Sequence, residues 1–166
     1  MKRFVSSVQE RLSTEPCLIV VIADTSPINY LILIGQIDLL KQLYARILVP
    51  PAVLSELKHA LAPKPVRDWA LNAPAWVEVL IPKGNLILVQ LDVGESEALA
   101  LAAELHADVV LMDDQAGRQE AVRRGMRVAA TLSILDEAEQ AGLVRFDDAV
   151  AALQKTSFRV SRCWQR

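Results

Sequence analysis

The sequence predicts an α/β fold with a mostly parallel sheet, because short apolar runs alternate with longer segments of helical character. Two runs are the clearest: residues 17–23 end at Asp24, and residues 108–112 end at the pair Asp113 and Asp114. Runs of this length, rich in β-branched and aliphatic residues, are typical of strands buried on both faces. The 166 residues are 52% hydrophobic and 23% charged, which indicates one globular domain with a substantial core.

Prolines, glycines and capping residues set the ends of the predicted helices. Ser26 and Pro27 suit the N-cap and the first position of a helix, and Gly35 ends it. Pro51 starts another helix, which Pro63 breaks. We expect helices over residues 28–34, 37–44, 52–62, 66–72, 94–106, 115–124, 132–141 and 147–154. We expect strands over residues 17–23, 47–49, 76–80, 109–112 and 127–130, and a short extended piece over 86–89.

The domain is expected to cover residues 17–156, between an N-terminal extension (1–16) and a C-terminal tail (157–166). The extension lacks the apolar centre of a secretory signal, and no apolar run approaches the roughly 18 residues that cross a bilayer. Cys17 and Cys163 form neither a disulfide framework nor a zinc site, so we expect a cytoplasmic protein. The formal net charge of −2 neither favours nor excludes a nucleic-acid partner.

Acidic residues at the ends of two predicted strands indicate a metal site. The carboxyl ends of parallel strands form the ligand-binding crevice of an open sheet, so Asp24 and Asp113 are expected to converge there. Carboxylates in such a place repel one another unless a cation lies between them, and Mg²⁺ takes oxygen ligands. The pattern therefore predicts a metal site that acts on phosphate. A structural interpretation stays open: Asp24 also suits a helix cap, and Asp114 suits the N-cap of the helix from Gln115.

Two glutamates are further candidates. Glu95 falls on the apolar face of the helix over 94–106, whereas Glu97 is expected to point away from that face. A carboxylate on a buried face needs a partner or a cation. The alternative for Glu95 is a capping box with Asp92 as the N-cap. Glu56 lies at the edge of the apolar stripe of its helix, a position that suits a cleft and solvent equally.

Basic residues follow the second acidic pair. Arg118 lies one turn into the helix that Asp114 begins, and is expected near the same crevice. Further along lie Arg123, Arg124 and Arg127, and the tail holds Arg159, Arg162 and Arg166 around Trp164. They suit phosphate contacts around the metal site, or else a solvated helix end and a frayed terminus.

Four motifs in order resemble those of PIN-domain proteins. They are DTSP at residues 24–27, PPAVLSEL at 50–57, GESEALALA at 94–102 and LMDDQAGR at 111–118. They are most similar to the VapC-related branch, in which the first motif reads DTSP and the last reads DD-x-x-G-R. The resemblance covers about residues 18–145, and residues 157–161 also resemble the C-terminal region of this branch.

The resemblance implies a three-layer α/β/α fold and a ribonuclease that depends on Mg²⁺ or Mn²⁺. It implies catalytic roles for Asp24, Glu56, Glu95 and Asp113, and metal binding by three of them (Asp24, Glu95 and Asp113) together with Asp114. Ser26 and Arg118 would bind the RNA substrate. Many relatives are toxins of toxin–antitoxin pairs, and many form homodimers, so a cognate antitoxin and a second copy of the chain are expected partners. The chain has Glu at position 95 where the commoner pattern has Asp.

Three other classes of protein are alternatives to the ribonuclease hypothesis. A haloacid-dehalogenase-like phosphatase needs an Asp-x-Asp pair after the first strand, but Thr25 and Ser26 follow Asp24. A receiver-like signalling domain needs the acidic pair first and the single Asp later, which is the reverse of the order here. A PIN-fold binding module with weak or no catalysis, acting through an antitoxin or RNA, remains an open alternative.

Overall fold

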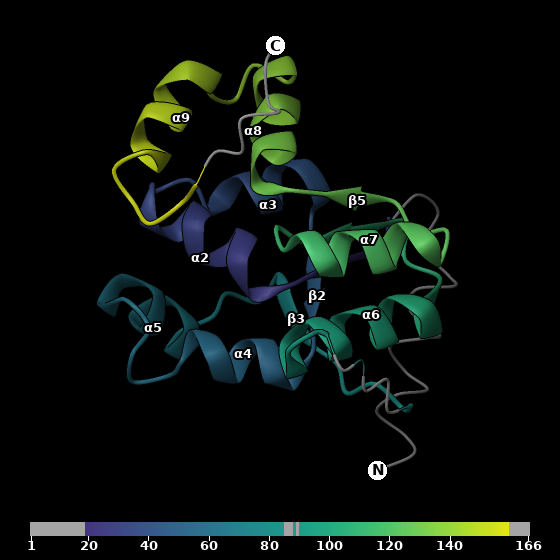
Figure 1. Cartoon of the computed structure of the whole chain (residues 1–166). Helices are drawn as coiled ribbons and strands as arrows, with labels where there is room; N and C mark the ends of the chain where they lie inside the picture. The colour runs from purple at the N-terminus through teal and green to yellow at the C-terminus, as the bar shows by residue number, and fades with distance from the viewer. Residues whose placement is uncertain (1–18, 85–87, 89, 160–166) are drawn as a thin grey trace.

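The computed structural model describes residues 19–84, 88 and 90–159. Within this part of the chain, drawn in Figure 1, a five-stranded sheet is parallel throughout. Its strand order is β3-β2-β1-β4-β5. The strands are β1 (Val21–Ala23), β2 (Ile47–Val49), β3 (Val77–Val79), β4 (Val109–Leu111) and β5 (Val128–Ala129). The helices are α2 (Thr25–Leu33), α3 (Asp38–Tyr44), α4 (Pro51–Leu57), α5 (Lys64–Leu71), α6 (Val93–Leu105), α7 (Gln115–Arg123), α8 (Thr131–Gln140) and α9 (Phe146–Leu153).

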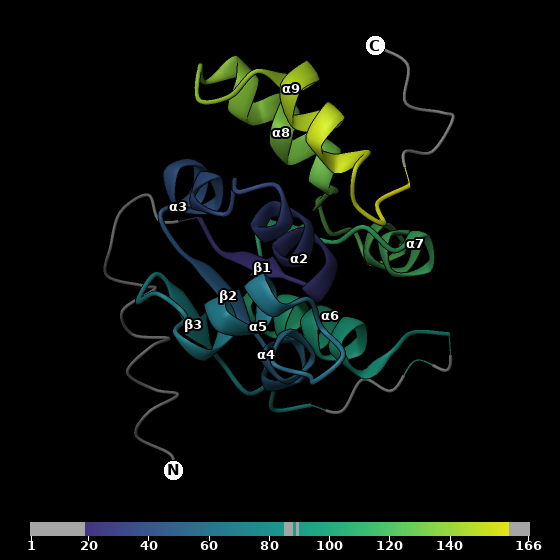
Figure 2. The ribbon, with the colours of Figure 1, turned by 90° about the vertical axis from the view of Figure 1, so that its left-hand side faces the viewer.

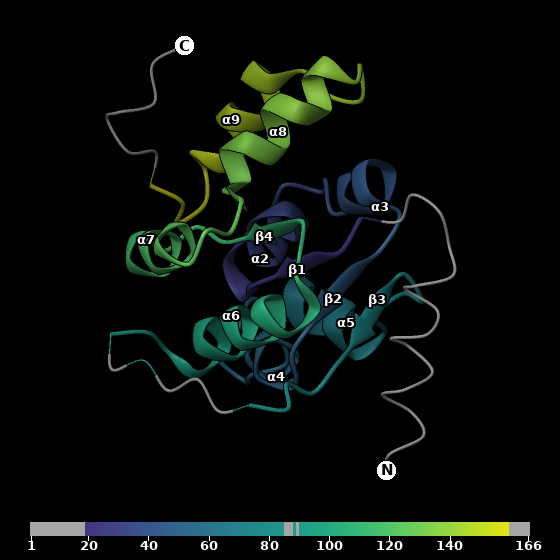
Figure 3. The ribbon, with the colours of Figure 1, turned by 90° about the vertical axis from the view of Figure 1, so that its right-hand side faces the viewer.

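Helices cover both faces of the sheet, which confirms the three-layer α/β/α fold (Figures 2 and 3). Side chains alternate between the faces along each strand. Val21 and Ala23 of β1 join the core that α2, α3, α5, α8 and α9 complete. Ile22, between them, joins the core formed with α6 and Ala121 of α7. Strands buried on both faces explain the nearly continuous apolar runs in the sequence.

The first helix begins earlier than predicted. Asp24 has an extended backbone and occupies the N-cap position, so α2 starts at Thr25. Ser26 and Pro27 are therefore the second and third helical residues, and the prediction that Ser26 caps the helix was wrong. Pro27 is tolerated there because the first N–H groups of a helix have no intrahelical partner. Gly35, with φ of +71°, follows the end of α2 as predicted.

The predicted helix over 52–62 is shorter in the structure, where α4 ends at Leu57. Beyond Leu57 the chain has no apolar face to bury: Lys58, His59 and Ala60 are exposed, and 89% of Leu61 is exposed. Helical stability in proteins comes mainly from packing of an apolar face, and this segment forms turns instead. The other predicted helices and strands are present with ends shifted by a few residues.

Some predictions fall outside the described residues. These are the extension (1–16), Cys17 with the start of the first strand, most of the extended piece at 86–89, and residues 160–166, which include Arg162, Cys163, Trp164 and Arg166. Two described residues of the expected tail contact α2. The ring of Phe158 packs edge-on against Tyr30, with centroids 4.8 Å apart, and the Ser157 hydroxyl lies 3.3 Å from the Tyr30 hydroxyl. In the described part of the chain, no helix is both long and apolar enough to cross a membrane.

Candidate active site

The candidate site lies at the carboxyl edge of the sheet, where the central strands β1 and β4 end side by side. Asp24 follows β1 directly, and its backbone N–H donates to the carbonyl oxygen of Leu111 at 2.9 Å. Only 3% of Asp24 is exposed, and its side-chain Oδ1 is buried with no hydrogen-bond partner among the described residues. A buried, unpaired carboxylate oxygen is costly unless it is protonated or binds a cation.

Glu56 approaches this aspartate from α4. The Thr25 hydroxyl donates a hydrogen bond to Glu56 Oε2, so the residue after Asp24 holds the Glu56 carboxylate. Gly94, in the first turn of α6, lies so close that a Cβ there would be 2.5 Å from Glu56 Oε1. Burial raises the pKa of Glu56, and the Thr25 hydroxyl partly opposes that shift.

Glu95 combines the two interpretations that the sequence left open. It forms a capping box with Asp92: Glu95 N–H donates to Asp92 Oδ1 at 2.8 Å, and Asp92 N–H donates to Glu95 Oε2 at 3.0 Å. Glu95 is nevertheless buried on the sheet side of α6, as its place on the helical wheel predicted. Burial raises its pKa, and the charges of Asp92, Asp114 and Glu56 raise it further.

Asp24, Glu56, Asp92 and Glu95 form a cluster that we call the acidic cluster. Burial raises the pKa of Asp24 to about 8, and the charges of Asp92, Glu95 and Glu56 contribute to the shift. The hydrogen bond from the Thr25 backbone opposes it. At neutral pH, Asp24 therefore tends to hold a proton. A divalent cation would reverse this preference by stabilising the ionised carboxylate.

Asp113 and Asp114 end β4 and have different partners. The Thr131 backbone N–H donates to Asp113 Oδ1 at 2.8 Å, and the Thr131 hydroxyl donates to Asp113 Oδ2 at 2.6 Å. Burial raises the pKa of Asp113, while Thr131 and the charge of Arg118 oppose that shift. Asp114 is the N-cap of α7 and accepts from Gly117 N–H at 2.9 Å, as predicted. Asp114 also acts electrostatically on Glu95, so it borders the acidic cluster.

Two predicted substrate residues lie at the same edge of the sheet. Ser26 is half-buried in the first turn of α2. Arg118 lies in the second turn of α7 and acts electrostatically on Asp113. Its Nε is buried and has no hydrogen-bond partner in the part of the chain that the structure describes.

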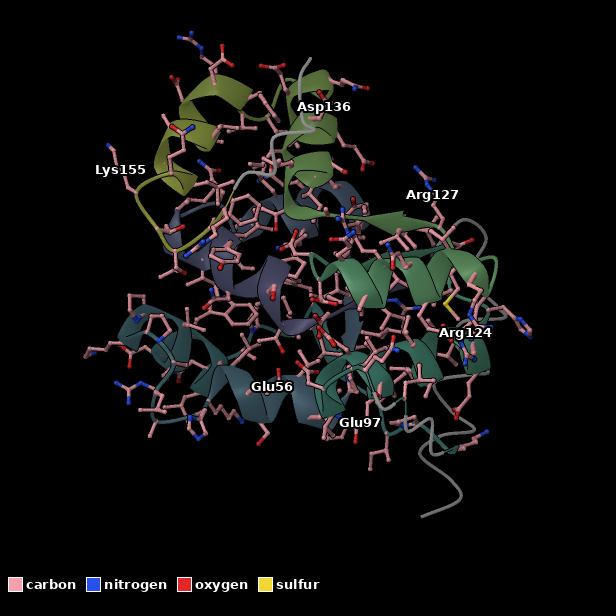
Figure 4. The ribbon with its side chains drawn as sticks, viewed as in Figure 1. Glu56, Glu97, Arg124, Arg127, Asp136 and Lys155 are labelled. Carbon is pink, nitrogen blue, oxygen red and sulfur yellow. The ribbon has the colours of Figure 1, made fainter. Side chains whose placement is uncertain are left out.

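Glu97, which was predicted to point away from the apolar face of its helix, has a partner on a neighbouring helix. Its Oε2 accepts a hydrogen bond from Ala52 N–H in the first turn of α4 at 3.1 Å. Figure 4 shows Glu97 and Glu56 on these neighbouring helices, α6 and α4. This partner was not predicted, because the wheel of one helix does not reveal where a second helix packs. The charge of Glu97 also raises the pKa of Glu56.

The later basic residues of this segment do not flank the site. α7 starts at the acidic edge and runs back along the sheet, so its last turn lies at the opposite edge. There Arg123 and Arg124 pair with Glu120 at 2.7 Å and 2.6 Å. Arg127 directly precedes β5 and lies with Arg124 at the far end of α7 (Figure 4). Of the arginines on α7 that were predicted to contact phosphate, Arg118 is thus the one that lies near the strand ends.

Three polar residues contribute more to the site than their sequence positions suggested. Asp92 was considered only as a cap, yet its charge acts on Asp24, Glu56 and Glu95. Thr25 holds Glu56, and Thr131 holds Asp113. Residues just beyond the carboxyl ends of parallel strands line the ligand-binding crevice, which is why Asp24 was a candidate. The same argument could have identified Thr131, because it lies just beyond the carboxyl end of β5, the strand next to β4.

The donor set suits a hard divalent cation, since it consists of carboxylate oxygens and includes the unpaired Oδ1 of Asp24. In the described ranges no group of three or more His, Cys, Asp or Glu residues is arranged closely enough to hold a metal ion. Hydrogen bonds from other residues orient these carboxylates: Thr25 donates to Glu56, the Asp92 backbone to Glu95, and Thr131 to Asp113. In its donor chemistry the site therefore fits a divalent cation.

Comparison with family models places the chain in a known family. The family model DUF3368, which is described as a PIN domain, matches residues 20–164 and so includes every element of the sheet. No curated protein matches the chain.

Proposed function

Because the chain belongs to the PIN-domain family, we propose that it is a metal-dependent endoribonuclease that hydrolyses RNA phosphodiesters. The observation that carries the proposal is the buried Asp24, with its unpaired Oδ1, at the end of the central strand β1. Glu56, Asp92 and Glu95 lie close enough to raise its pKa. Three carboxylates around a buried fourth are unfavourable by themselves and become favourable when a cation binds.

In this proposal Asp24, Glu95, Asp113 and Asp114 would hold Mg²⁺ or Mn²⁺, and Glu56 would act through a water molecule. When bound, the cation supplies a positive charge that lowers the pKa of water and offsets the charge that develops on the phosphate. Glu56, which the Thr25 hydroxyl orients, is suited to accept a proton from the attacking water. Water would attack the phosphorus atom in line with one bridging P–O bond, which breaks, and the leaving ribose oxygen would take a proton from solvent. The RNA 2′-hydroxyl is therefore not needed as a nucleophile.

The remaining residues would orient the substrate and the carboxylates. Thr131 holds both oxygens of Asp113 and so sets the plane of that carboxylate. Arg118 would bind a phosphate next to the one that is cleaved, because it is a cation whose charge acts on Asp113 at the strand end. Ser26, in the first turn of α2, would contact the RNA at the same edge.

The test is cleavage of a labelled, structured RNA by the purified protein with Mg²⁺, with Mn²⁺ and with EDTA. Asp24→Asn and Asp113→Asn should reduce cleavage by several orders of magnitude, since each removes a negative ligand. Asp147→Asn is the matched control, because Asp147 is an exposed carboxylate on α9, away from the strand ends. Metal-independent cleavage, or full activity of Asp24→Asn, would contradict the proposal.

We further propose that this nuclease is the toxin of a toxin–antitoxin pair, that it is a homodimer, and that a cognate antitoxin binds it. Induced expression in a bacterial host should then stop growth, and Asp24→Asn should restore growth at equal protein level. Light scattering during size-exclusion chromatography of the purified chain measures the oligomeric state. Unchanged growth in the presence of active enzyme would argue against the toxin role alone.

A second candidate is a binding module of the same fold with weak or no catalysis. One observation favours it: Thr131 donates a hydrogen bond to each oxygen of Asp113, so this carboxylate already has protein partners on both oxygens. Calorimetric titration with Mn²⁺ separates the two candidates. Binding that is lost in Asp24→Asn, together with cleavage, supports the nuclease, whereas RNA binding without metal binding or cleavage supports the binding module.

A further inference from the structure

A groove runs along one side of α7 and begins beside the strand end that carries Asp113 and Asp114. Its volume is about 480 Å³, which lies within the usual range for small-ligand sites. One wall is a stripe of α7 at helical spacing, and the opposite wall includes Val128 of the edge strand β5 and Ser133 of α8. The α7 side chains in the stripe are Gln115, Arg118, Gln119 and Val122.

The groove is connected to the candidate active site at both walls. Gln115 directly follows Asp114, the N-cap of α7. Ser133 lies in the same first turn of α8 as Thr131, which binds Asp113. A ligand that occupies the groove would therefore reach the end of β4, where the phosphodiester is expected to lie.

The lining chemistry fits a nucleotide. Arg118 lines the groove and is a cation, so the outer nitrogens of its guanidinium can donate hydrogen bonds to a phosphate. Gln115 and Gln119 carry amides that can both donate and accept hydrogen bonds, as base edges require. Val122, with 65% of its surface exposed, and Val128 provide an apolar surface for the face of a base.

We propose that this groove binds the unpaired nucleotide next to the cleaved phosphodiester, a proposal that rests on the nuclease function proposed above. Arg118 contacts its phosphate, Gln115 and Gln119 contact the base edge, and Val122 and Val128 contact the base face. Base edges are accessible to such contacts only when the base is not paired and stacked in an A-form helix.

The experiment measures RNA binding in EDTA, so that it does not depend on catalysis. The probes are a fluorescently labelled 10-nucleotide single strand of mixed sequence and the same strand in a duplex. Val122→Glu places a negative charge in the groove and should weaken single-strand binding about tenfold or more. Leu71→Glu is the matched control, because Leu71 is 66% exposed on α5 and lies outside the groove.

A second variant keeps the test independent of folding. Gln119→Ala removes one amide from an exposed helical position, and in the active enzyme it should change the base preferred next to the cut. Tighter binding of the single strand than of the duplex, and weaker binding by Val122→Glu but not Leu71→Glu, supports the groove. Equal Kd values for the two glutamate variants, or preference for the duplex, would overturn it.

Failure of the groove and failure of the nuclease proposal give different results. If Asp24→Asn abolishes cleavage but Val122→Glu binds RNA as the wild type does, the nuclease stands and the groove assignment is wrong. If the wild type does not cleave RNA but Val122→Glu still weakens single-strand binding, the groove stands and the nuclease proposal is wrong.

Discussion

Thr131 donates one hydrogen bond to each oxygen of the Asp113 carboxylate, from its backbone N–H at 2.8 Å and from its hydroxyl at 2.6 Å. Thr131 is fully buried and is the first residue of α8, whose N-cap position is Ala130. Alanine has no side-chain oxygen to cap a helix, so Asp113 satisfies the N–H at the start of α8 from the neighbouring strand end. One carboxylate thus links the site to the packing of α8.

Replacement of Thr131 by Val should affect both stability and activity. The change keeps the side-chain shape but removes the hydroxyl, and loss of a hydrogen bond to a buried carboxylate should reduce the free energy of unfolding by about 1–3 kcal/mol. The hydroxyl also lowers the pKa of Asp113, so its loss raises that pKa and should shift the acid limb of the pH–activity profile to higher pH. Thr131→Ser should restore the profile. A shift in stability without any shift in the profile would limit Thr131 to a structural role.

Asp24 should make the metal-free protein less stable as the pH rises from about 4 to about 8. The pKa is 3.8 in the unfolded chain and about 8 in the folded protein, so in this range the unfolded chain releases a proton that the folded protein retains. Stability then falls by up to about 1.4 kcal/mol per pH unit and levels off above the folded pKa. Asp24→Asn should remove this loss. Urea denaturation at pH 5, 7 and 9 in EDTA measures it, and parallel curves for both proteins would contradict the prediction.

Gly94→Ala should separate activity from stability. The new Cβ would lie 2.5 Å from Glu56 Oε1, so the end of the Glu56 side chain has to move. Helix propensity favours alanine by about 1 kcal/mol, so the free energy of unfolding should change by no more than about that amount. Cleavage should fall about tenfold, on the order of a misplaced catalytic group. The double variant with Glu56→Gln should lose no more activity than Glu56→Gln alone; additive losses would mean that Gly94 acts independently of Glu56.

Gly117→Ala should destabilise the fold through the core. A Cβ at this position would lie 2.3 Å from Sδ of the fully buried Met112, a distance that forces the methionine to move. Overpacking of this kind costs about 1–3 kcal/mol. Gly84→Ala is the control, since its Cβ would meet Glu104 Oε1 at an ordinary 3.7 Å. Thermal unfolding compares the two variants, and equal melting temperatures would rule out the close contact with Met112.

The buried elements were the most predictable parts of the fold. β2 was predicted with its observed bounds, and β4 within one residue, because strands buried on both faces leave an unbroken apolar run. The end of α4 was not predictable, because Ala60 and Leu61 continue a helical apolar stripe in the sequence but have nothing to pack against. The start of α2 was displaced because Ser26 and Pro27 are capping residues by type, whereas the extended backbone at Asp24 decides where the helix begins.

By itself, the sequence determined the parallel α/β fold and the residues that end its central strands. Periodicity and strand-end position are local properties, and they were sufficient to place Asp24 and Asp113 at one edge and Glu95 on a buried helix face. Only the tertiary structure decided the partners of those residues. That Thr25 holds Glu56, that Thr131 holds Asp113 and that Glu97 caps α4 depend on elements far apart in the chain. A hydrogen bond depends on distances of a few ångströms between such elements, and those distances are set by packing rather than by sequence pattern.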